Sequence, residues 1–379
     1  MNQPFDGFYR GKTVLVTGDT GFKGSWLAVW LNHLGANVIG YALEPPSTPS
    51  NFAASCLDQR ITHVHGDVRD FGHFEKAFQQ HRPEVVFHLA AQAIVRLSYG
   101  KARYTFETNL MGTVNMLEAA RRTDSVKAVV SITSDKCYKN VGWEWGYRET
   151  DPLGGYDAYS ASKACAETAI AVYQNATFQR AANPPSDLAI ASTRAGNVIG
   201  GGDWASDRIV PDTVRAIASD KDIVVRSPDA TRPWQHVLEP LSAYLWLGVL
   251  LTKDRSYCTS WNVGPSDTQV STVKEVVTAI LQKWPTVSRL VVEPDGSQTE
   301  ALLLRLDCSK AACHLKWRST WMIDQTLDAV VSWYKRFYTS GEDMYAFTVH
   351  QIEDYTECAR SQNLMWACAG TPEVERSRS

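Results

Sequence analysis

The stretch that decides the fold is KTVLVTGDTGFKG, at residues 12–24. It begins with a short apolar run of strand type, and residues 25–34 continue with helical periodicity. Between the two, Gly18, Gly21 and Gly24 are spaced three residues apart. Glycines in this position permit a tight turn, close approach of a pyrophosphate and close packing of helix on strand. The free N–H groups and the dipole of the helix favour phosphate, so we predict a dinucleotide site here.

Downstream of this unit, short apolar runs alternate with longer amphipathic segments. Strands are expected at residues 37–41, 61–66, 84–89, 128–132 and 188–193, and helices at 71–81, 104–122 and 157–174. Strands that alternate with helices of about 10–15 residues form βαβ units with right-handed crossovers. We therefore predict an α/β fold, with a Rossmann-type doubly wound parallel sheet and a smaller α/β substrate-binding lobe.

The domain boundaries follow from the point at which this alternation ends. Residues 1–193 are expected to form the dinucleotide-binding Rossmann domain, to which a segment near 236–262 returns. Residues 194–345, which contain Gly-rich and Pro-rich stretches, are expected to form mainly the substrate-binding lobe. Residues 346–379 are expected to form a C-terminal helix and a tail, and the polar end of that tail is expected to be disordered.

Composition narrows the classes of partner. Of 379 residues, 44% are hydrophobic and 21% are charged, and the formal net charge is −3 without a basic run. This balance argues against nucleic acid and an anionic membrane surface as partners. There is no apolar stretch of about 18 residues and no apolar core of a signal peptide at the start, so we expect a cytoplasmic protein. The eight cysteines lack zinc-site spacing, so they are expected to be free thiols and no metal is expected.

Other segments of the first domain extend the dinucleotide site. Asp67, after the third strand, is placed to accept from an adenine amino group, although a turn-capping role is equally compatible. Ala90, after the fourth strand, would let the backbone touch the dinucleotide, with core packing as the alternative. Position 42, where many relatives of this fold carry an acid for the ribose, is alanine, so we expect weaker cofactor binding. The residues expected at the cofactor are Gly18, Thr20, Gly21, Phe22, Lys23, Gly24, Asp67, Val68, Leu89, Ala90 and Asn109.

A candidate catalytic pair lies in the sequence YSASK at residues 159–163. Tyr159 and Lys163 are four residues apart and therefore share one face of a helix. A lysine ammonium beside a phenol stabilises phenolate and lowers the tyrosine pKa from its usual value of about 10. Such a tyrosine could take a proton from a sugar hydroxyl. A solvated helix with no catalytic role is the alternative when the motif is taken alone.

Taken together, these motifs resemble the extended short-chain dehydrogenase/reductase family, from about residue 11 to about residue 333. The discriminating segment is TSDKCY at 133–138, where an acidic residue and a second ionisable residue follow Ser134. This pattern is similar to that of the nucleotide-sugar 4,6-dehydratases within the family. The stretches GNVIGGGDW at 196–204 and RPWQHVLEP at 232–240 match as well. The resemblance implies NAD as the cofactor.

The resemblance also implies a role for each catalytic residue. Tyr159 would take the O4 proton while C4 hydride passes to NAD, and Lys163 would hold Tyr159 and the nicotinamide ribose. Ser134 would hydrogen-bond O4. Asp135 would be the acid for the leaving C6 hydroxyl, and Lys136 would be the C5 base. These roles require a raised pKa for Asp135 and a lowered pKa for Lys136.

The remaining expectations concern the substrate and the assembly. The resemblance implies CDP-glucose, dehydrated to a 4-keto-6-deoxy sugar for deoxysugar synthesis such as that of the O-antigen of lipopolysaccharide. Asn197, Arg208 and Arg232 are the expected substrate ligands, because guanidinium groups match phosphate oxygens. A 4-epimerase, a GDP-mannose-type dehydratase and a non-catalytic dinucleotide sensor stay open as alternatives. The resemblance implies a homodimer built on helices 104–122 and 157–174, and a homotetramer is an alternative.

Overall fold

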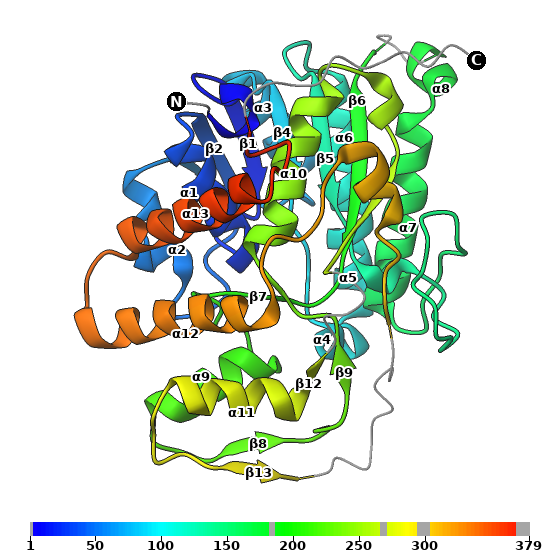
Figure 1. Ribbon diagram of the computed structural model, residues 1–379. Coiled ribbons are helices and arrows are strands. Elements are labelled where there is room, and N and C mark those ends of the chain that lie inside the picture. Colours follow the sequence, from blue (N-terminus) through cyan, green and yellow to red (C-terminus); the bar gives the residue numbers. More distant parts are fainter. Residues whose placement is uncertain (1–2, 182–185, 266–270, 294–303, 369–379) are drawn as a thin grey trace.

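A seven-stranded parallel sheet is the centre of the larger lobe (Figure 1). The computed structural model describes residues 3–181, 186–265, 271–293 and 304–368. The strand order is β11-β6-β5-β4-β1-β2-β3, so the chain reverses direction across the sheet between β1 and β4. The strands are β1 Thr13–Thr17, β2 Asn37–Ala42, β3 Thr62–His65, β4 Val85–His88, β5 Ala128–Ile132, β6 Ala189–Ala195 and β11 Ser260–Val263. The expected doubly wound α/β fold is confirmed.

Helices cover both faces of this sheet, which explains why its central strands are apolar. All four residues of β4 and all five of β5 are buried, as expected for a parallel sheet packed on both sides. One face carries α1 Phe22–His33, α10 Leu238–Leu251 and α13 Met344–Ser361, and the other carries α3 Phe71–His81, α6 Gly112–Arg121 and α7 Ala158–Gln174. Short helices α2 Asn51–Ala54, α4 Val95–Gly100 and α8 Ala176–Ala181 complete the lobe.

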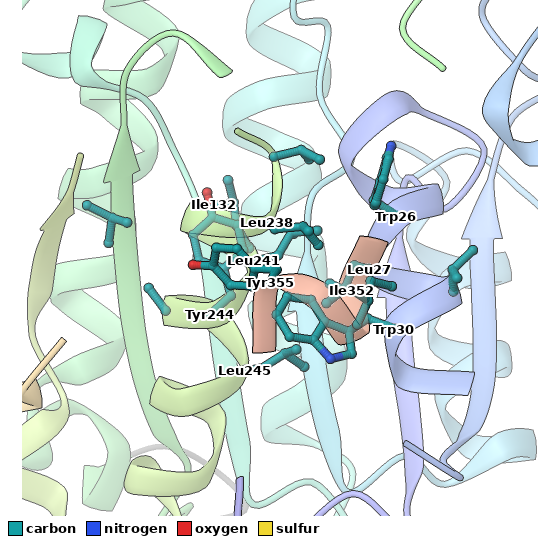
Figure 2. Close-up of a cluster of buried hydrophobic side chains, with 14 of the residues drawn as sticks. Trp26, Leu27, Trp30, Ile132, Leu238, Leu241, Tyr244, Leu245, Ile352 and Tyr355 are labelled. Atoms are coloured by element: carbon teal, nitrogen blue, oxygen red, sulfur yellow. The ribbon is translucent and has the colours of Figure 1, made fainter. Parts of the chain in front are cut away.

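The core on the α1 face is rich in aromatic side chains (Figure 2). Trp30 of α1 and Tyr355 of α13 meet edge to face, with ring centroids 6.0 Å apart. Trp366 stacks on Tyr355 at 5.6 Å and on Phe5 at 5.2 Å, so both described ends of the chain enter this core. Each such pair contributes about 0.5–1.5 kcal/mol beyond its buried area. The packing fixes α1, whose N-terminus carries the glycine turn.

The expected helix at 104–122 is wrong in one respect. It consists of α5 Ala102–Phe106, a π-helical turn at Glu107–Met111 and α6. Within the π-helical turn, the side chain of Asn109 is fixed between Gln92 and α7. A π-turn inserts one residue and re-aims a side chain, and such turns are common at functional sites. The helix expected at 25–34 begins three residues earlier, at Phe22.

A smaller lobe lies beyond the carboxyl ends of the strands (Figure 1). It contains α9 Ile209–Ala218, α11 Val273–Lys283 and three two-stranded sheets, which are β8 Ile223–Val225 with β13 Leu290–Val292, β9 Thr231–Arg232 with β12 Ser271–Thr272, and β7 Val198–Ile199 with β10 Gln235–His236. Helix α12 Ile323–Ser340 precedes α13. The polar end that was expected to be disordered, 370–379, lies outside the described residues. Among the helices described, none is long and apolar enough to cross a membrane.

Candidate active site

The glycine turn between β1 and α1 is shaped to receive a phosphate. Gly18 has a φ of +75°, and a Cβ there would lie 2.9 Å from the backbone nitrogen of Ala90. A Cβ on Gly24 would lie 2.0 Å from the carbonyl oxygen of Gly18, so this position must be glycine for helix and turn to pack. Gly21 caps α1 without a side-chain hydrogen bond to the helix N-terminus. The backbone N–H groups of that end therefore remain available to an anion.

Asp19, the residue after Gly18, joins the glycine turn to the third strand of the sheet. Asp19 is completely buried, and its carboxylate lies 2.7 Å from Nδ1 of His63 on β3. Burial raises the pKa of Asp19, and the hydrogen bond with Asp19 raises the pKa of His63. A Cβ on Gly40 of β2 would lie 2.1 Å from the Asp19 carboxylate, so the glycine makes room for this side chain.

The predicted cofactor residues of the turn and of the third strand lie at the carboxyl edge of the sheet. The Thr20 hydroxyl donates to the carbonyl of Leu43, at 2.9 Å. Asp67 accepts from the side chain and the backbone of Arg69, and this pairing lowers the Asp67 pKa. The next residue, Val68, is buried. The adenine contact expected for Asp67 stays a prediction.

The residues after the fourth strand are held by hydrogen bonds to the protein itself. The backbone nitrogens of Leu89 and Ala90 donate to Oγ1 of Thr17, each at 3.1 Å. Asn109 accepts from the backbone of Gln92 at 2.8 Å and donates to Ser162 of α7 at 2.9 Å. Asn109 thus ties the loop after β4 to the helix that carries the tyrosine and the lysine.

The predicted catalytic residues lie together where β5 ends against α7. Ser134 Oγ donates to Oδ1 of Asp135 at 2.9 Å, and Lys136 Nζ lies 3.5 Å from the same oxygen. Ser134 lies close enough to Tyr159 to favour its phenolate and oppose the rise in its pKa. Lys163 Nζ donates to the carbonyl oxygen of Ile132, at 3.3 Å. The side chain of Asp135 is 3% exposed and that of Lys136 is 37% exposed, so the acid of this pair is buried and the lysine partly faces solvent.

The electrostatics of this corner correct two expectations. The pKa of Tyr159 is raised, because burial outweighs the opposing effects of Ser134 and of the charge of Lys136. The pKa of Lys136 is also raised, and not lowered, because the Asp135 carboxylate beside it favours the ammonium. Burial lowers the pKa of Lys163 to about 8. The sequence motif could not give these directions, because they depend on the depth of each side chain.

Further cations surround the corner. Lys23 projects from the first turn of α1, and burial together with Arg208 and Lys163 lowers its pKa to about 8. Arg208 forms an ion pair with Asp203 at 2.9 Å, and its positive charge lowers the pKa of Tyr159 against the effect of burial. The positive charge of Arg232 lowers the pKa of Lys136, against the larger effect of Asp135. This concentration of positive charge is suited to an anionic substrate or cofactor.

The third expected substrate ligand, Asn197, is joined to a neighbouring strand by its backbone. Asn197 lies between β6 and β7, and its backbone carbonyl accepts from Gln235 at 3.2 Å. Its side chain is half-buried. The contact of Asn197 with a substrate stays a prediction.

Residues 15–330 match the family described as GDP-mannose 4,6 dehydratase. The chain belongs to this family. A CDP-glucose 4,6-dehydratase of Salmonella typhimurium is 45% identical over 349 residues, covering 92% of this chain and 97% of the relative. A dTDP-glucose 4,6-dehydratase of Xanthomonas campestris is 26% identical and covers 85% and 93%, respectively. The expected membership of the extended short-chain dehydrogenase/reductases is confirmed.

Solved structures share the fold of this GDP-mannose 4,6-dehydratase family member. The dTDP-glucose 4,6-dehydratase of Bacillus anthracis aligns with a TM-score of 0.69 and 22% identity, covering 86% of this chain and 97% of that one. The UDP-glucose 4-epimerase of Thermotoga maritima aligns with a TM-score of 0.71 and 20% identity, covering 86% and 99%. Dehydratases and epimerases thus share this backbone, so side chains must distinguish their reactions.

Sequence reasoning missed two charged residues of this family member. Glu167 of α7 and Arg194 of β6 form a buried ion pair with an N–O distance of 2.6 Å. The one available signal was the position of Glu167, four residues after Lys163 and therefore on the same face of the helix. Nothing in the sequence indicated that Arg194, at the end of an apolar strand, would be its partner.

Proposed function

We propose that this protein is an NAD-dependent nucleotide-sugar 4,6-dehydratase that converts CDP-glucose to CDP-4-keto-6-deoxyglucose and water. The observation that carries the proposal is the pair Asp135 and Lys136, 3.5 Å apart beside Tyr159. Oxidation at C4 needs one base, whereas elimination across C5 and C6 needs a further acid and a further base. An epimerase requires no such pair. The 45% identity with a CDP-glucose 4,6-dehydratase supports both the reaction and the nucleotide.

The turn at Gly18, Gly21 and Gly24 would hold the pyrophosphate of NAD, and Tyr159 and Lys163 would face the nicotinamide ribose. The turn fits a pyrophosphate because no side chain in the described part of the chain occupies the N–H groups at the N-terminus of α1. It also fits because only glycine allows the close packing at Gly24. When bound, NAD supplies the acceptor for the C4 hydride and its donor to C6. Ala42 offers no carboxylate to the adenosine ribose, so we propose weaker binding than in relatives with an acid there.

The chain's own residues would move the protons. Tyr159 takes the O4 proton, and Lys163 keeps positive charge near the phenol. Ser134, which lies beside Tyr159, orients O4. Lys136 removes the C5 proton that the 4-ketone makes acidic, and Asp135 protonates the C6 hydroxyl, which leaves as water. The proton that Lys136 then holds would return to C5 as C6 gains hydride.

The raised pKa of Lys136 adds a requirement to this scheme. In the resting protein Lys136 holds the proton and the neighbouring Asp135 stabilises its charge. Transfer of this one proton from Lys136 Nζ to the Asp135 carboxylate produces the free amine and the neutral acid together. No proton need enter from solvent for this transfer.

The test of the function compares nucleotide-glucoses. The protein with added NAD is mixed separately with CDP-, dTDP-, GDP- and UDP-glucose, and alkali-induced absorbance of a 4-keto-6-deoxy product is measured. We expect product from CDP-glucose first, with Arg208, Arg232 and Asn197 binding its pyrophosphate. Epimerised sugar without water loss would contradict the proposed reaction. A preference for another nucleotide-glucose would contradict the assignment of cytosine as the nucleotide base.

We also propose a cytoplasmic homodimer. Met111 of the π-turn and Val172 of α7 are 47% and 46% exposed, which leaves apolar surface on the two helices expected to pair across a two-fold axis. A dimer mass in light scattering at micromolar concentration would support it, a monomer would contradict it, and a tetramer would indicate a second interface. The product class suits deoxysugar synthesis, including that of O-antigen.

A further inference from the structure

The buried carboxylate of Glu167 joins the elements around the catalytic corner. Its side chain is 1% exposed and lies one helical turn after Lys163 on α7. The Thr133 hydroxyl donates to its Oε1. Its Oε2 accepts from Ser192 at 2.9 Å, from Arg194 at 2.6 Å and from Ser260 at 3.1 Å. One carboxylate thus contacts the end of β5 and the neighbouring strands β6 and β11.

Arg194 carries the network to the other end of the catalytic segment 133–138. Its Nη1 donates to the hydroxyl of Tyr138 at 2.7 Å, and its guanidinium lies 4.9 Å from the centroid of that ring. The Tyr138 hydroxyl in turn donates to Asn262 of β11 at 2.7 Å. The ion pair therefore contacts the first residue of the segment, Thr133, through Glu167, and the last residue, Tyr138, through Arg194.

We propose that Glu167 is a positioning residue, which together with Arg194 clamps both ends of segment 133–138 against α7. The segment carries Asp135 and Lys136, and α7 carries Tyr159, so the clamp sets the distance between the two groups of reacting side chains. The inference rests on the proposed dehydratase function, in which these groups act on adjacent carbons of one sugar.

The charge of Glu167 has a second consequence at Lys163. Burial lowers the pKa of Lys163 to about 8, and the negative charge of Glu167 opposes that shift. Without this charge, Lys163 would lose its proton at lower pH. Lys163, four residues after Tyr159 on α7, would then be neutral at a pH at which it carries a charge in the wild type.

The energetics of the pair agree with a positional role. A buried ion pair is often replaced by apolar side chains without loss of stability, so its presence alone is weak evidence for a stabilising role. Here Oε1 of Glu167 accepts from Thr133, and Oε2 accepts from groups on β6 and β11. Apolar side chains could fill this space, but they could not hydrogen-bond the hydroxyls of Thr133 and Tyr138 and so orient them.

Two hydroxyl deletions test the clamp with a matched control. Thr133→Val and Ser192→Ala each remove one hydroxyl donor to Glu167, but only Thr133 borders the catalytic segment. We expect Thr133→Val to lower kcat at least tenfold with little change in KM, because a displacement of about 1 Å can cost about 100-fold. Ser192→Ala should stay within about twofold of the wild type, and Thr133→Ser should restore the activity. Equal kcat values for Thr133→Val and Ser192→Ala would overturn the inference.

A labelling experiment tests the charge of Glu167 without relying on turnover. The pH dependence of acetylation of Lys163 by trace acetic anhydride, read by peptide mass spectrometry, gives its titration in the folded protein. We expect Glu167→Gln to move this midpoint down by about one pH unit, and Ser192→Ala to leave it unchanged. An unchanged midpoint in a folded Glu167→Gln variant would refute the electrostatic part. If the wild type converts no nucleotide-glucose, the proposed function fails, whereas the labelling result still decides the charge of Lys163.

Discussion

Replacing Lys136 with alanine should separate the two chemical stages of the proposed reaction. The variant keeps Tyr159, Ser134 and Lys163, so oxidation at C4 should still occur. It lacks the C5 base, so the ketone should accumulate together with NADH on the enzyme. General acid–base catalysis by one positioned side chain is worth about 10²–10⁴-fold. We therefore expect overall turnover to fall by that factor, which corresponds to about 3–5 kcal/mol of barrier.

The structure adds a smaller effect on the first stage. The charge of Lys136 lowers the pKa of Tyr159 against the effect of burial. Without this charge the Tyr159 pKa should rise further, so the pH at which C4 oxidation is half-maximal should move upward. Lys136→Arg, which keeps a charge near Asp135 but cannot act as a base at neutral pH, should show less of this pH displacement. Turnover should remain low in both variants.

The assay is rapid mixing with CDP-glucose, followed at the NADH absorbance and by deuterium exchange at C5. Lys139→Ala is the matched control, because Lys139 is an exposed lysine one residue beyond the catalytic segment 133–138. The control should exchange deuterium and turn over as the wild type does. Wild-type exchange and turnover in Lys136→Ala would refute the assignment of the base. No NAD reduction at all would show that Lys136 instead positions substrate or cofactor.

Three further substitutions test the cofactor site and the core. Gly21→Val should abolish dinucleotide binding, because the branched side chain would enter the phosphate site; equilibrium dialysis that recovers normal NAD binding would show the turn to be misassigned. Gly40→Ala places a Cβ 2.1 Å from the Asp19 carboxylate; overpacking should lower the free energy of unfolding by about 1–3 kcal/mol, and unchanged denaturant unfolding would contradict this. Glu239 accepts three hydrogen bonds in the core, and burial raises its pKa to about 7. Glu239→Gln should lose about 1–3 kcal/mol. The folded-state pKa of Glu239 is above its usual value, so the wild-type advantage should shrink as the pH rises from about 5 to 8, and a pH-independent difference would contradict the raised pKa.

The sheet and the glycine turn could be predicted because periodicity and turn chemistry are local. Residues 128–132 and 71–81 were expected as a strand and a helix, and both have these bounds. The π-turn at Glu107–Met111 was missed, because it arises where Asn109 meets Gln92 and Ser162, contacts that no local pattern encodes.

The candidate catalytic residues could be located by motif, but the directions in which the pKa values of Lys136 and Tyr159 are shifted could not be predicted. Asp135, Lys136 and Tyr159 were expected together and lie together in the structure. The direction of the Lys136 pKa depends on the competition between burial and the adjacent carboxylate, and the adjacent carboxylate prevails. A sequence shows that the two residues are neighbours, but it does not show how deeply each is buried.

The contact between Phe5 and Trp366 has a consequence for how the protein packs while it is being synthesised. The α1 helix is apolar on nearly every side, and one of its sides is covered by α13 near the end of the chain. During synthesis the glycine turn and α1 emerge well before α13, so of its aromatic neighbours Trp30 has Phe5 early but lacks Tyr355 and Trp366 until these have left the ribosome. The nascent chain must therefore keep a tryptophan-rich helix from aggregating until residue 366 has emerged, and the larger lobe reaches its final packing only after that point.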